Sequence, residues 1–282
     1  MPEILDGKEL AQKIRSNLKI KVDELKLEGI HPKLAVIMIG EDPSSKIYVR
    51  NKSKACEEIG IEYEEFLLKD TIQMEELLKL IDTLNKRQDV HGILLQSPIP
   101  NNLDINLAFK SIVPEKDVDG FNPVNVGRLC LNQDGFVSCT PFGVMKLLEE
   151  YNIDVEGKNA VIIGRSNIVG KPMAQCLLNK NATITICHSK TKKLDKITKT
   201  ADILISAVGK PKFVKKNMVK EGAVVIDVGT NRLEDGKLVG DVDFDEVAPI
   251  TSYITKVPGG VGPMTIAMLM TNVVKAAKEM NK

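Results

Sequence analysis

Tryptophan is absent from this 282-residue sequence, and aromatic residues make up only 4% of it. Platforms on which nucleic-acid bases stack need exposed aromatic rings, so such platforms are not expected. The charges nearly cancel, because 39 Lys and Arg stand against 38 Asp and Glu, for a formal net charge of +1. This balance provides no field that would attract nucleic acid or an anionic membrane. We therefore expect neither as a partner.

Long apolar runs and a cysteine framework are also missing. The most apolar late stretch, Met264 to Val274, is much shorter than the roughly 20 residues that span a bilayer. The N-terminal MPEILDGKEL has acidic residues where a signal peptide has basic ones. The five cysteines form no CxxC pair, which is typical of buried free thiols in a reducing compartment. These features predict a cytoplasmic protein, and we expect no metal site.

The composition is that of a globular protein, with 43% hydrophobic and 27% charged residues, and the length favours two domains. Apolar runs alternate with helical patterns such as 73–86 and 169–179. The runs are apolar throughout, as in strands covered by helices on both faces. They are LAVIMI at 34–39, HGILLQ at 91–96, NAVIIG at 159–164, ATITIC at 182–187, DILISA at 202–207 and AVVIDVG at 223–229. The alternation predicts an α/β fold with parallel sheets.

The pattern breaks between Pro114 and Pro141 into a stretch rich in Asp, Asn, Gly and Pro, with at most a short hairpin at 132–135. Long irregular segments of compact proteins are usually functional or lie between domains. We therefore place the domain boundary here. A last helical run follows PGGVGP at 258–263 and can cross back onto the first domain.

Residues 159–172, NAVIIGRSNIVGKP, have the order of strand, glycine turn and helix found in dinucleotide-binding βαβ units. Backbone amides at the start of such a helix can hold a pyrophosphate. The spacing departs from GxGxxG, because Ser166 stands at the second glycine position and Gly170 follows Gly164 by six residues. The segment thus matches the motif in order but not in spacing.

The next strand ends in Cys187, His188, Ser189 and Lys190, without an Asp or Glu to bind a ribose hydroxyl. Arg165 and Ser189 can instead donate hydrogen bonds to a 2′-phosphate, for which arginine offers a bidentate fork. This favours NADP over NAD. The alternatives are that Arg165 is a plain exposed charge and His188 a solvated turn residue.

A helix predicted after the turn at Asp42 carries three polar residues on one face. Ser45, Tyr48 and Lys52 are spaced three and four residues apart, so their side chains project together. If this face packs against the sheet, the lysine is partly buried and its pKa falls. The alternative is a solvated basic face, because three more cations lie nearby: Lys46, Arg50 and Lys54.

Two further polar residues follow predicted strands, Gln96 before SPIP and Asp119 in KDVDGF. The carboxyl ends of strands are where α/β proteins bind ligands. Gln96 can hydrogen-bond Lys52, and Asp119 can accept two hydrogen bonds from an aminopyrimidine-like ring. Each can equally be a loop residue whose hydrogen bonds are satisfied locally.

Together these segments resemble the methylenetetrahydrofolate dehydrogenase/cyclohydrolase family over almost the entire chain. The resemblance is carried by GEDPSSKIYVRNKSKA, VHGILLQSPIP, PEKDVDGFNPVNVGRL, CTPFGV, GRSNIVGKP, CHSKT, VVIDVGTN and PGGVGPMT. So many specific segments in one order are not expected by chance. One departure is Ser97, where the family more often has leucine, and this change would loosen the pterin pocket slightly.

The resemblance implies a role for each matching residue. The catalytic residues it implies are Lys52, Tyr48 and Gln96. The substrate-binding residues are Ser45, Tyr48, Asp119, Gly262 and Pro263, and the NADP-binding residues are Gly164, Arg165, Ser166, Gly170, Ser189 and Thr230. It also implies an N-terminal α/β domain of residues 1–138 completed by 265–282, a Rossmann domain of residues 139–264, a cleft between them, and a homodimer formed through the Rossmann domain.

Such an enzyme of one-carbon metabolism oxidises 5,10-methylenetetrahydrofolate with NADP and hydrolyses the methenyl product to 10-formyltetrahydrofolate. Hydride transfer needs no strong base, whereas the hydrolysis needs proton transfers that Lys52 can perform. One alternative is a monofunctional NAD(P) dehydrogenase acting on another small substrate, which would leave Tyr48, Lys52 and Gln96 unexplained. Another is a noncatalytic NADP- or folate-binding module, against which Lys52 and Asp119 argue.

Overall fold

The computed structural model describes residues 2–281 and divides into two compact units. One unit contains Thr140–Thr265 together with the residues up to Ala11. The other contains Gln12–Cys139 and the chain from Ile266 onward. Each unit is built on one parallel sheet, so we call them the six-stranded and the three-stranded unit.

The sheet of the six-stranded unit has the order β1-β11-β8-β7-β5-β6, and every neighbouring pair is parallel. Its strands are β1 (Glu3–Leu5), β5 (Asn159–Ile163), β6 (Thr183–Cys187), β7 (Ile203–Ser206), β8 (Val224–Asp227) and β11 (Tyr253–Thr255). A small antiparallel pair joins β9 (Asn231–Arg232) and β10 (Leu238–Val239). The unit also contains α6 (Cys139–Glu150), α7 (Gly170–Leu178), α8 (Leu194–Thr198), α9 (Phe244–Val247) and two short 3-10 turns, Lys216–Met218 and Ala248–Ile250.

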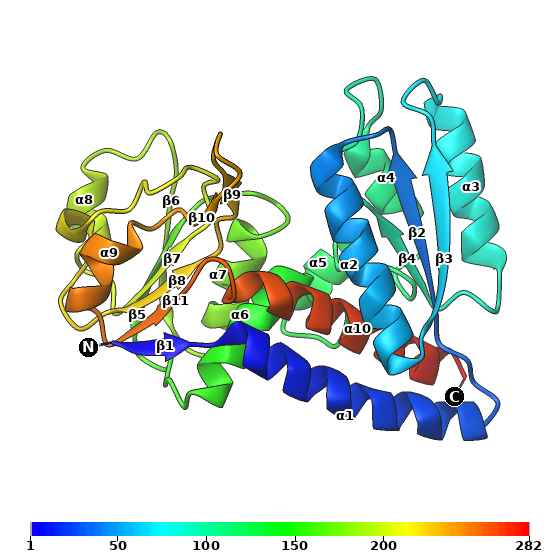
Figure 1. The fold of residues 1–282 in the computed structure, drawn as a ribbon, viewed down its shortest axis with the longest axis horizontal. Coiled ribbons are helices and arrows are strands. Elements are labelled where there is room, and N and C mark those ends of the chain that lie inside the picture. Colours follow the sequence, from blue (N-terminus) through cyan, green and yellow to red (C-terminus); the bar gives the residue numbers. More distant parts are fainter. Residues whose placement is uncertain (1, 282) are drawn as a thin grey trace. The chain divides into compact units, whose positions relative to one another are not determined.

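The sheet of the three-stranded unit places β2 (Lys33–Ile39) between β3 (Glu62–Leu68) and β4 (Gly92–Leu95), all parallel (Figure 1). The remaining elements are α2 (Pro43–Ile59), α3 (Met74–Lys86), α4 (Ile105–Ser111), α5 (Pro123–Cys130) and most of α1 (Gly7–Leu27) and α10 (Val261–Met280). Alternate residues of β2, such as Ala35 and Ile37, pack with Leu77 and Ile81 of α3. Residues of β2 between them, such as Val36, are fully buried as well. Helices therefore cover both faces, which explains the continuous apolar run.

The α/β fold with parallel sheets is confirmed, and so is the final helix that completes the N-terminal unit. The observed division differs from the predicted one at the N-terminus. Strand β1 pairs with β11, so the first residues belong to the six-stranded unit. This pairing joins segments about 250 residues apart, which no local pattern reveals.

One expectation for the segment 114–141 was wrong. Residues 132–135 form turns and bends, which agrees with the expectation of at most a short hairpin, but α5 lies inside the segment predicted to be irregular. The side chain of Asn122 caps α5 by accepting the Val124 N–H at 2.8 Å, and Pro123 occupies its first turn. Asparagine followed by proline is therefore a helix start here. Within residues 2–281, no helix is long and apolar enough to span a membrane.

Candidate functional site

Helix α2 is bounded by local signals at both ends. The Asp42 carboxylate accepts the backbone N–H of Ser45 at 2.7 Å, and Pro43 stands where the helix needs no N–H donor. The helix ends at Gly60, whose φ of 82° lies in the left-handed region that favours glycine. Positions 45, 48 and 52 therefore share one face of a helix whose start and end are set by its own sequence.

Burial distinguishes the two interpretations of this helix. One interpretation was a solvated basic face, and its three cations are all exposed: Lys46, Arg50 and Lys54. Lys52, by contrast, is half-buried, and Ser45 is buried with 3% of its surface exposed. Tyr48 keeps 41% of its surface exposed. The solvated basic face exists, but Lys52 is not part of it.

Lys52 is held by the residue that follows β4. Its Nζ donates to Gln96 Oε1 at 2.9 Å, and Gln96 Nε2 donates to the Ser97 carbonyl oxygen at 2.6 Å. Gln96 is buried, and its backbone N–H continues the sheet by donating to Ile37 O. The amide is thus engaged at both ends, so its carbonyl oxygen stays directed at the lysine.

Lys52 and Asp119 form a coupled pair with opposite shifts. Burial lowers the pKa of Lys52, and the charge of Asp119 partly opposes this. Burial raises the pKa of Asp119, and the charge of Lys52 opposes that shift in turn. The Cys139 thiol donates to Asp119 Oδ1 at 3.7 Å, and burial raises the pKa of this thiol, which keeps it protonated. A buried acid and base perturbed in this way are typical of catalytic sites.

The loop that carries Asp119 is fastened by Asp117. The buried Asp117 carboxylate accepts the N–H of Phe121 at 3.1 Å, the N–H of Asn122 at 2.8 Å and Asn125 Nδ2 at 2.8 Å. Burial raises the pKa of Asp117 to about 7. Gly120 has a φ of 71°, and a Cβ there would collide with the backbone of residues 136–138. The loop therefore depends on a glycine and a buried acid.

Asn272 of α10 ties this loop to the following segment, and our sequence analysis did not identify it. Its Nδ2 donates to Val118 O at 2.8 Å and to Val137 O at 3.2 Å, and it also lies 3.8 Å from Cys139 Sγ. Asn272 has only 2% of its surface exposed. A polar residue in an otherwise apolar helix face is the one signal that could have drawn attention to it.

The glycine turn of the six-stranded unit is as close-packed as a dinucleotide motif requires. A Cβ on Gly164 would overlap the carbonyl oxygen of Ala207, and one on Gly170 would overlap the carbonyl oxygen of Gly164. The Ser166 hydroxyl accepts the N–H groups of Val169 at 3.1 Å and Gly170 at 3.3 Å, where α7 begins. Ser166 therefore caps the helix in addition to its proposed cofactor contact.

The other predicted cofactor residues lie at one edge of the same sheet. Because β5, β6, β7 and β8 are parallel, their carboxyl ends meet there. Arg165 follows β5, Ser189 follows β6 and Thr230 follows β8, and all three are exposed. His188 is half-buried, and its Nδ1 accepts the Lys190 N–H at 3.2 Å. It is a structural residue of the turn.

Gly262 and Pro263 lie in the first turn of α10, within the six-stranded unit. Gly262 is exposed and Pro263 is half-buried. The structure thus collects the predicted residues in two places. Lys52, Gln96 and Asp119 come together in the three-stranded unit, and the dinucleotide residues at the carboxyl edge of the other sheet.

Comparisons with known proteins match both parts of the chain. The model of the tetrahydrofolate dehydrogenase/cyclohydrolase catalytic domain matches residues 5–119, and that of the NAD(P)-binding domain of the same family matches residues 138–281. The Bifunctional protein FolD of Campylobacter concisus is 58% identical over 276 residues, which is 98% of each chain.

Solved structures give the same result. The bifunctional FolD methylenetetrahydrofolate dehydrogenase/cyclohydrolase of Campylobacter jejuni superposes with a TM-score of 0.98 at 56% identity, covering 99% of both chains. The Trypanosoma brucei enzyme, solved with NADP and an inhibitor, has a TM-score of 0.96 at 38% identity and covers 100% of both chains. The resemblance identified in the motifs is confirmed. This chain therefore belongs to the tetrahydrofolate dehydrogenase/cyclohydrolase family.

Proposed function

We propose that this protein oxidises 5,10-methylenetetrahydrofolate with NADP and hydrolyses the methenyl product to 10-formyltetrahydrofolate. The observation that carries the proposal is the half-buried Lys52, held by Gln96 and coupled to Asp119. It lies in the region matched by the catalytic-domain model, and the glycine turn lies in the region matched by the NAD(P)-binding model. In this proposal, most folate contacts come from residues 12–139 and the chain from 266 onward, and the cofactor contacts come from residues 140–265.

The residues at the carboxyl edge of the six-stranded sheet suit NADP. The turn from Gly164 to Gly170 brings backbone close to backbone at the start of α7, where a pyrophosphate binds in dinucleotide motifs. Arg165 and Ser189 are exposed donors for the 2′-phosphate, and Thr230 is an exposed hydroxyl after β8. When bound, NADP supplies the hydride acceptor.

In the oxidation, the protein has to bind and align rather than to remove a proton. Asp119 accepts hydrogen bonds from the pterin ring, and Ser45, Tyr48, Gly262 and Pro263 are further folate contacts. The methenyl cation that forms is stabilised by its own two flanking nitrogens. Alignment of donor and acceptor is therefore the main contribution of the chain to this step.

The hydrolysis needs proton transfer, and Lys52 performs it. The half-buried lysine, with its lowered pKa, can take a proton from the attacking water and return it as the ring opens. Gln96 holds the amine in place through the 2.9 Å hydrogen bond, and Tyr48 lies one helical turn away on the same face. Asp119 supplies the negative charge that keeps the ammonium form accessible.

The two alternative functions lack such support. A monofunctional dehydrogenase has no use for the Lys52 and Gln96 pair, and a noncatalytic module has none for a lysine with a lowered pKa. One coupled assay tests the proposal against both alternatives. Purified protein with methylenetetrahydrofolate and NADP should form NADPH and only transient methenyltetrahydrofolate, and NAD should be a poorer acceptor. Formation of no NADPH would contradict the proposal and favour one of the alternatives, whereas stable accumulation of methenyltetrahydrofolate would support the oxidation and contradict the hydrolysis.

A homodimer formed through the six-stranded unit is part of the proposal. In the described part of the chain, β6 pairs on one side only, with β5. Ile186 on this edge strand and Leu178 at the end of α7 have 37% and 52% of their surfaces exposed. Apolar side chains beside an unpaired strand edge favour pairing with a second copy. Sedimentation analysis should give twice the monomer mass, and Ile186→Lys should shift it toward the monomer.

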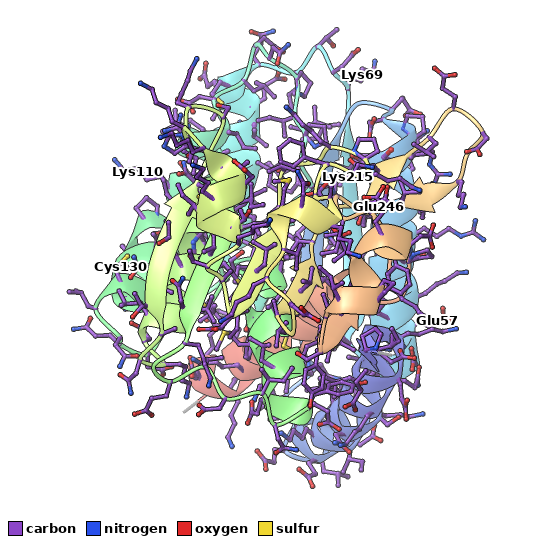
Figure 2. The ribbon with its side chains drawn as sticks, turned by 90° about the vertical axis from the view of Figure 1, so that its left-hand side faces the viewer. Glu57, Lys69, Lys110, Cys130, Lys215 and Glu246 are labelled. Atoms are coloured by element: carbon purple, nitrogen blue, oxygen red, sulfur yellow. The ribbon has the colours of Figure 1, made fainter. Side chains whose placement is uncertain are left out.

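The cysteines support a reducing compartment such as the cytoplasm. All five are free thiols. Four of them are buried, whereas Cys130 is exposed at the end of α5, as the label in Figure 2 indicates. An exposed free thiol persists where thiols are kept reduced. Fractionation of the source cells should recover the protein in the cytoplasmic fraction.

A further inference from the structure

Asp241 carries the carboxylate that accepts the most hydrogen bonds in the six-stranded unit. The proposed function gives this residue no role. Asp241 has 0% of its surface exposed, so it cannot touch a ligand. Its two oxygens accept five hydrogen bonds. The donors are Val208 N at 2.7 Å, Gly209 N at 3.2 Å and Ser206 Oγ at 3.3 Å to Oδ2, and Lys210 N at 2.9 Å and Asn231 Nδ2 at 3.0 Å to Oδ1.

These donors come from the end of β7, from the loop after it, and from Asn231 at the start of β9. Three consecutive backbone amides, at 208–210, point at one carboxylate, so the loop after β7 is wrapped around the side chain. Asn231 comes directly after Thr230, a proposed cofactor contact. One buried residue thus sets the shape of two adjacent loops.

Asp241 is itself held by a second buried acid, Asp227, at the end of β8. Asp227 accepts the N–H groups of Asp241 and Gly229 at 2.9 Å each, and that of Val242 at 2.8 Å. A Cβ on Gly229 would overlap the Asp241 carboxylate, and one on Gly240 would overlap the Asp227 carboxylate. The space around both acids is therefore filled to the point where only glycine fits.

The loop held by Asp241 borders the dinucleotide turn. Strand β5 has β6 on one side and β7 on the other, so the order of the sheet changes direction at β5. Dinucleotides bind across such a switch point, with one mononucleotide on each side. Gly164 lies so close to Ala207 that a Cβ would overlap its carbonyl oxygen. Arg165 and Ser189 are the proposed contacts on the β6 side of this switch point. Residues 207–210 lie on its β7 side.

We propose that Asp241 is a positioning residue for the nicotinamide half of NADP. Its carboxylate keeps residues 207–210 and Asn231 in the arrangement that receives this half, while the half bearing the 2′-phosphate depends on the β6 side. The inference rests on the proposed placement of NADP at this edge of the sheet. If Asp241 served folding alone, its loss would weaken the binding of both halves of NADP alike. A positioning role and a folding role therefore predict different binding patterns.

The test compares the whole cofactor with a fragment that carries only the 2′-phosphate half. Asp241→Asn replaces one acceptor oxygen by an amide NH2 that faces donors, so at least two hydrogen bonds are lost. The Kd for NADP should rise roughly 10- to 100-fold. The Kd for 2′,5′-ADP should stay within about twofold, and hydrolysis of added methenyltetrahydrofolate should continue at the wild-type rate. Dehydrogenase kcat should fall.

Asp202→Asn is the matched control. Asp202 lies directly before β7, whereas the loop that Asp241 holds follows the other end of that strand. Asp202 accepts the Asn159 N–H at 2.9 Å and Lys220 Nζ at 2.6 Å. This variant should lower thermal stability without separating NADP from 2′,5′-ADP. Equal weakening of both ligands by Asp241→Asn, or no weakening of either, would overturn the inference.

A milder variant keeps the test decisive if Asp241→Asn does not fold. Asn231→Ala removes a single donor at 3.0 Å and should give a smaller shift of the same kind, with NADP weakened and 2′,5′-ADP unchanged. An unchanged Kd for NADP in this variant would then contradict the inference. If wild-type protein fails to bind 2′,5′-ADP, the proposed 2′-phosphate site is wrong, and the inference falls with it.

Discussion

At the scale of single residues, we propose that Lys52 transfers protons in the hydrolysis and that Asp119 anchors the substrate in both reactions. Hydride transfer yields a cation without a base, whereas hydrolysis of that cation requires a proton to leave water and another to reach the departing nitrogen. Burial lowers the pKa of Lys52, which brings the amine closer to the range in which it can do both. The two activities should therefore respond differently to the loss of this amine.

Lys52→Met is the substitution that separates them. Methionine retains the aliphatic bulk of the side chain and removes the titrating amine. Cyclohydrolase activity should fall by about 10² or more, the usual contribution of a general acid or base, while dehydrogenase activity is reduced but measurable. Absorbance should show methenyltetrahydrofolate accumulating as NADPH forms.

Lys54→Met provides the control for this experiment, because Lys54 is exposed two residues further along the same helix. It should leave both activities near the wild-type level. Hydrolysis of methenyltetrahydrofolate by Lys52→Met at the wild-type rate would show that another group transfers the proton.

Asp119→Ala should lower both activities together. The substitution leaves the donors of the pterin ring unpaired in a partly buried site, which costs on the order of 1–3 kcal/mol. Calorimetry should show weaker folate binding and an almost unchanged affinity for NADP. Asp134→Ala, which removes a surface ion pair with Lys275 and a local hydrogen bond from the Gly135 N–H, should change neither. Normal folate binding by Asp119→Ala would refute the assignment of Asp119 as the pterin anchor.

At the scale of elements, our proposal assigns two roles to the turn between β5 and α7: it binds the pyrophosphate, and it carries the residue that distinguishes NADP from NAD. Arg165 lies on its exposed side, where a guanidinium can donate two hydrogen bonds to a 2′-phosphate. Arg165→Ala should raise the KM for NADP roughly 10- to 100-fold and that for NAD only slightly.

Steady-state kinetics with both cofactors check this expectation. Lys171→Ala serves as the comparison, because Lys171 lies directly after this turn, in the first turn of α7, but its Nζ donates to Asn167 Oδ1 at 2.7 Å. It should affect the two cofactors alike. If Arg165→Ala also affects them equally, Arg165 does not contact the 2′-phosphate.

Elements with strong local signals could be predicted from the sequence. The strands buried on both faces, such as β2 and β5, are continuous apolar runs, and α2 has both a cap and a terminal glycine. Because the spacing along a helix is regular, the shared face of Ser45 and Lys52 followed from their positions alone. Gln96 next to Lys52 followed from its place after a strand.

Elements that depend on distant partners could not be predicted. Strand β3, EYEEFLL, is an edge strand with exposed and half-buried residues, so it lacks the continuous apolar run by which its neighbour β2 was identified. Asn272 binds Val118, 154 residues away, and Asp241 binds donors that follow two different strands. Only the folded chain brings these partners together, so their spacing along the sequence does not predict the contacts.

At the scale of the whole molecule, each unit contains one buried carboxyl whose pKa is raised to about 7: Asp117 in the three-stranded unit and Asp227 in the other. Burial is the main cause in both. In the unfolded chain an Asp has a pKa of about 3.9. Between these values the folded protein binds more protons than the unfolded chain. The stability that this proton binding contributes is full below about pH 4 and is lost as the pH rises through 7.

Asp117→Asn mimics the protonated form and removes this titration, so its stability should depend less on pH. His91, whose pKa burial lowers, adds a pH dependence of opposite sign, but it is present in both proteins and cancels in the difference. From pH 5 to 7, the free energy of unfolding of the wild type should fall relative to the variant by up to about 1.4 kcal/mol per pH unit. Urea unfolding across this range measures the difference, and exposed Asp245→Asn should run parallel to the wild type. Because the donors from Phe121, Asn122 and Asn125 stay in place, an offset between wild type and Asp117→Asn that is constant with pH would mean that Asp117 is already ionised at pH 5.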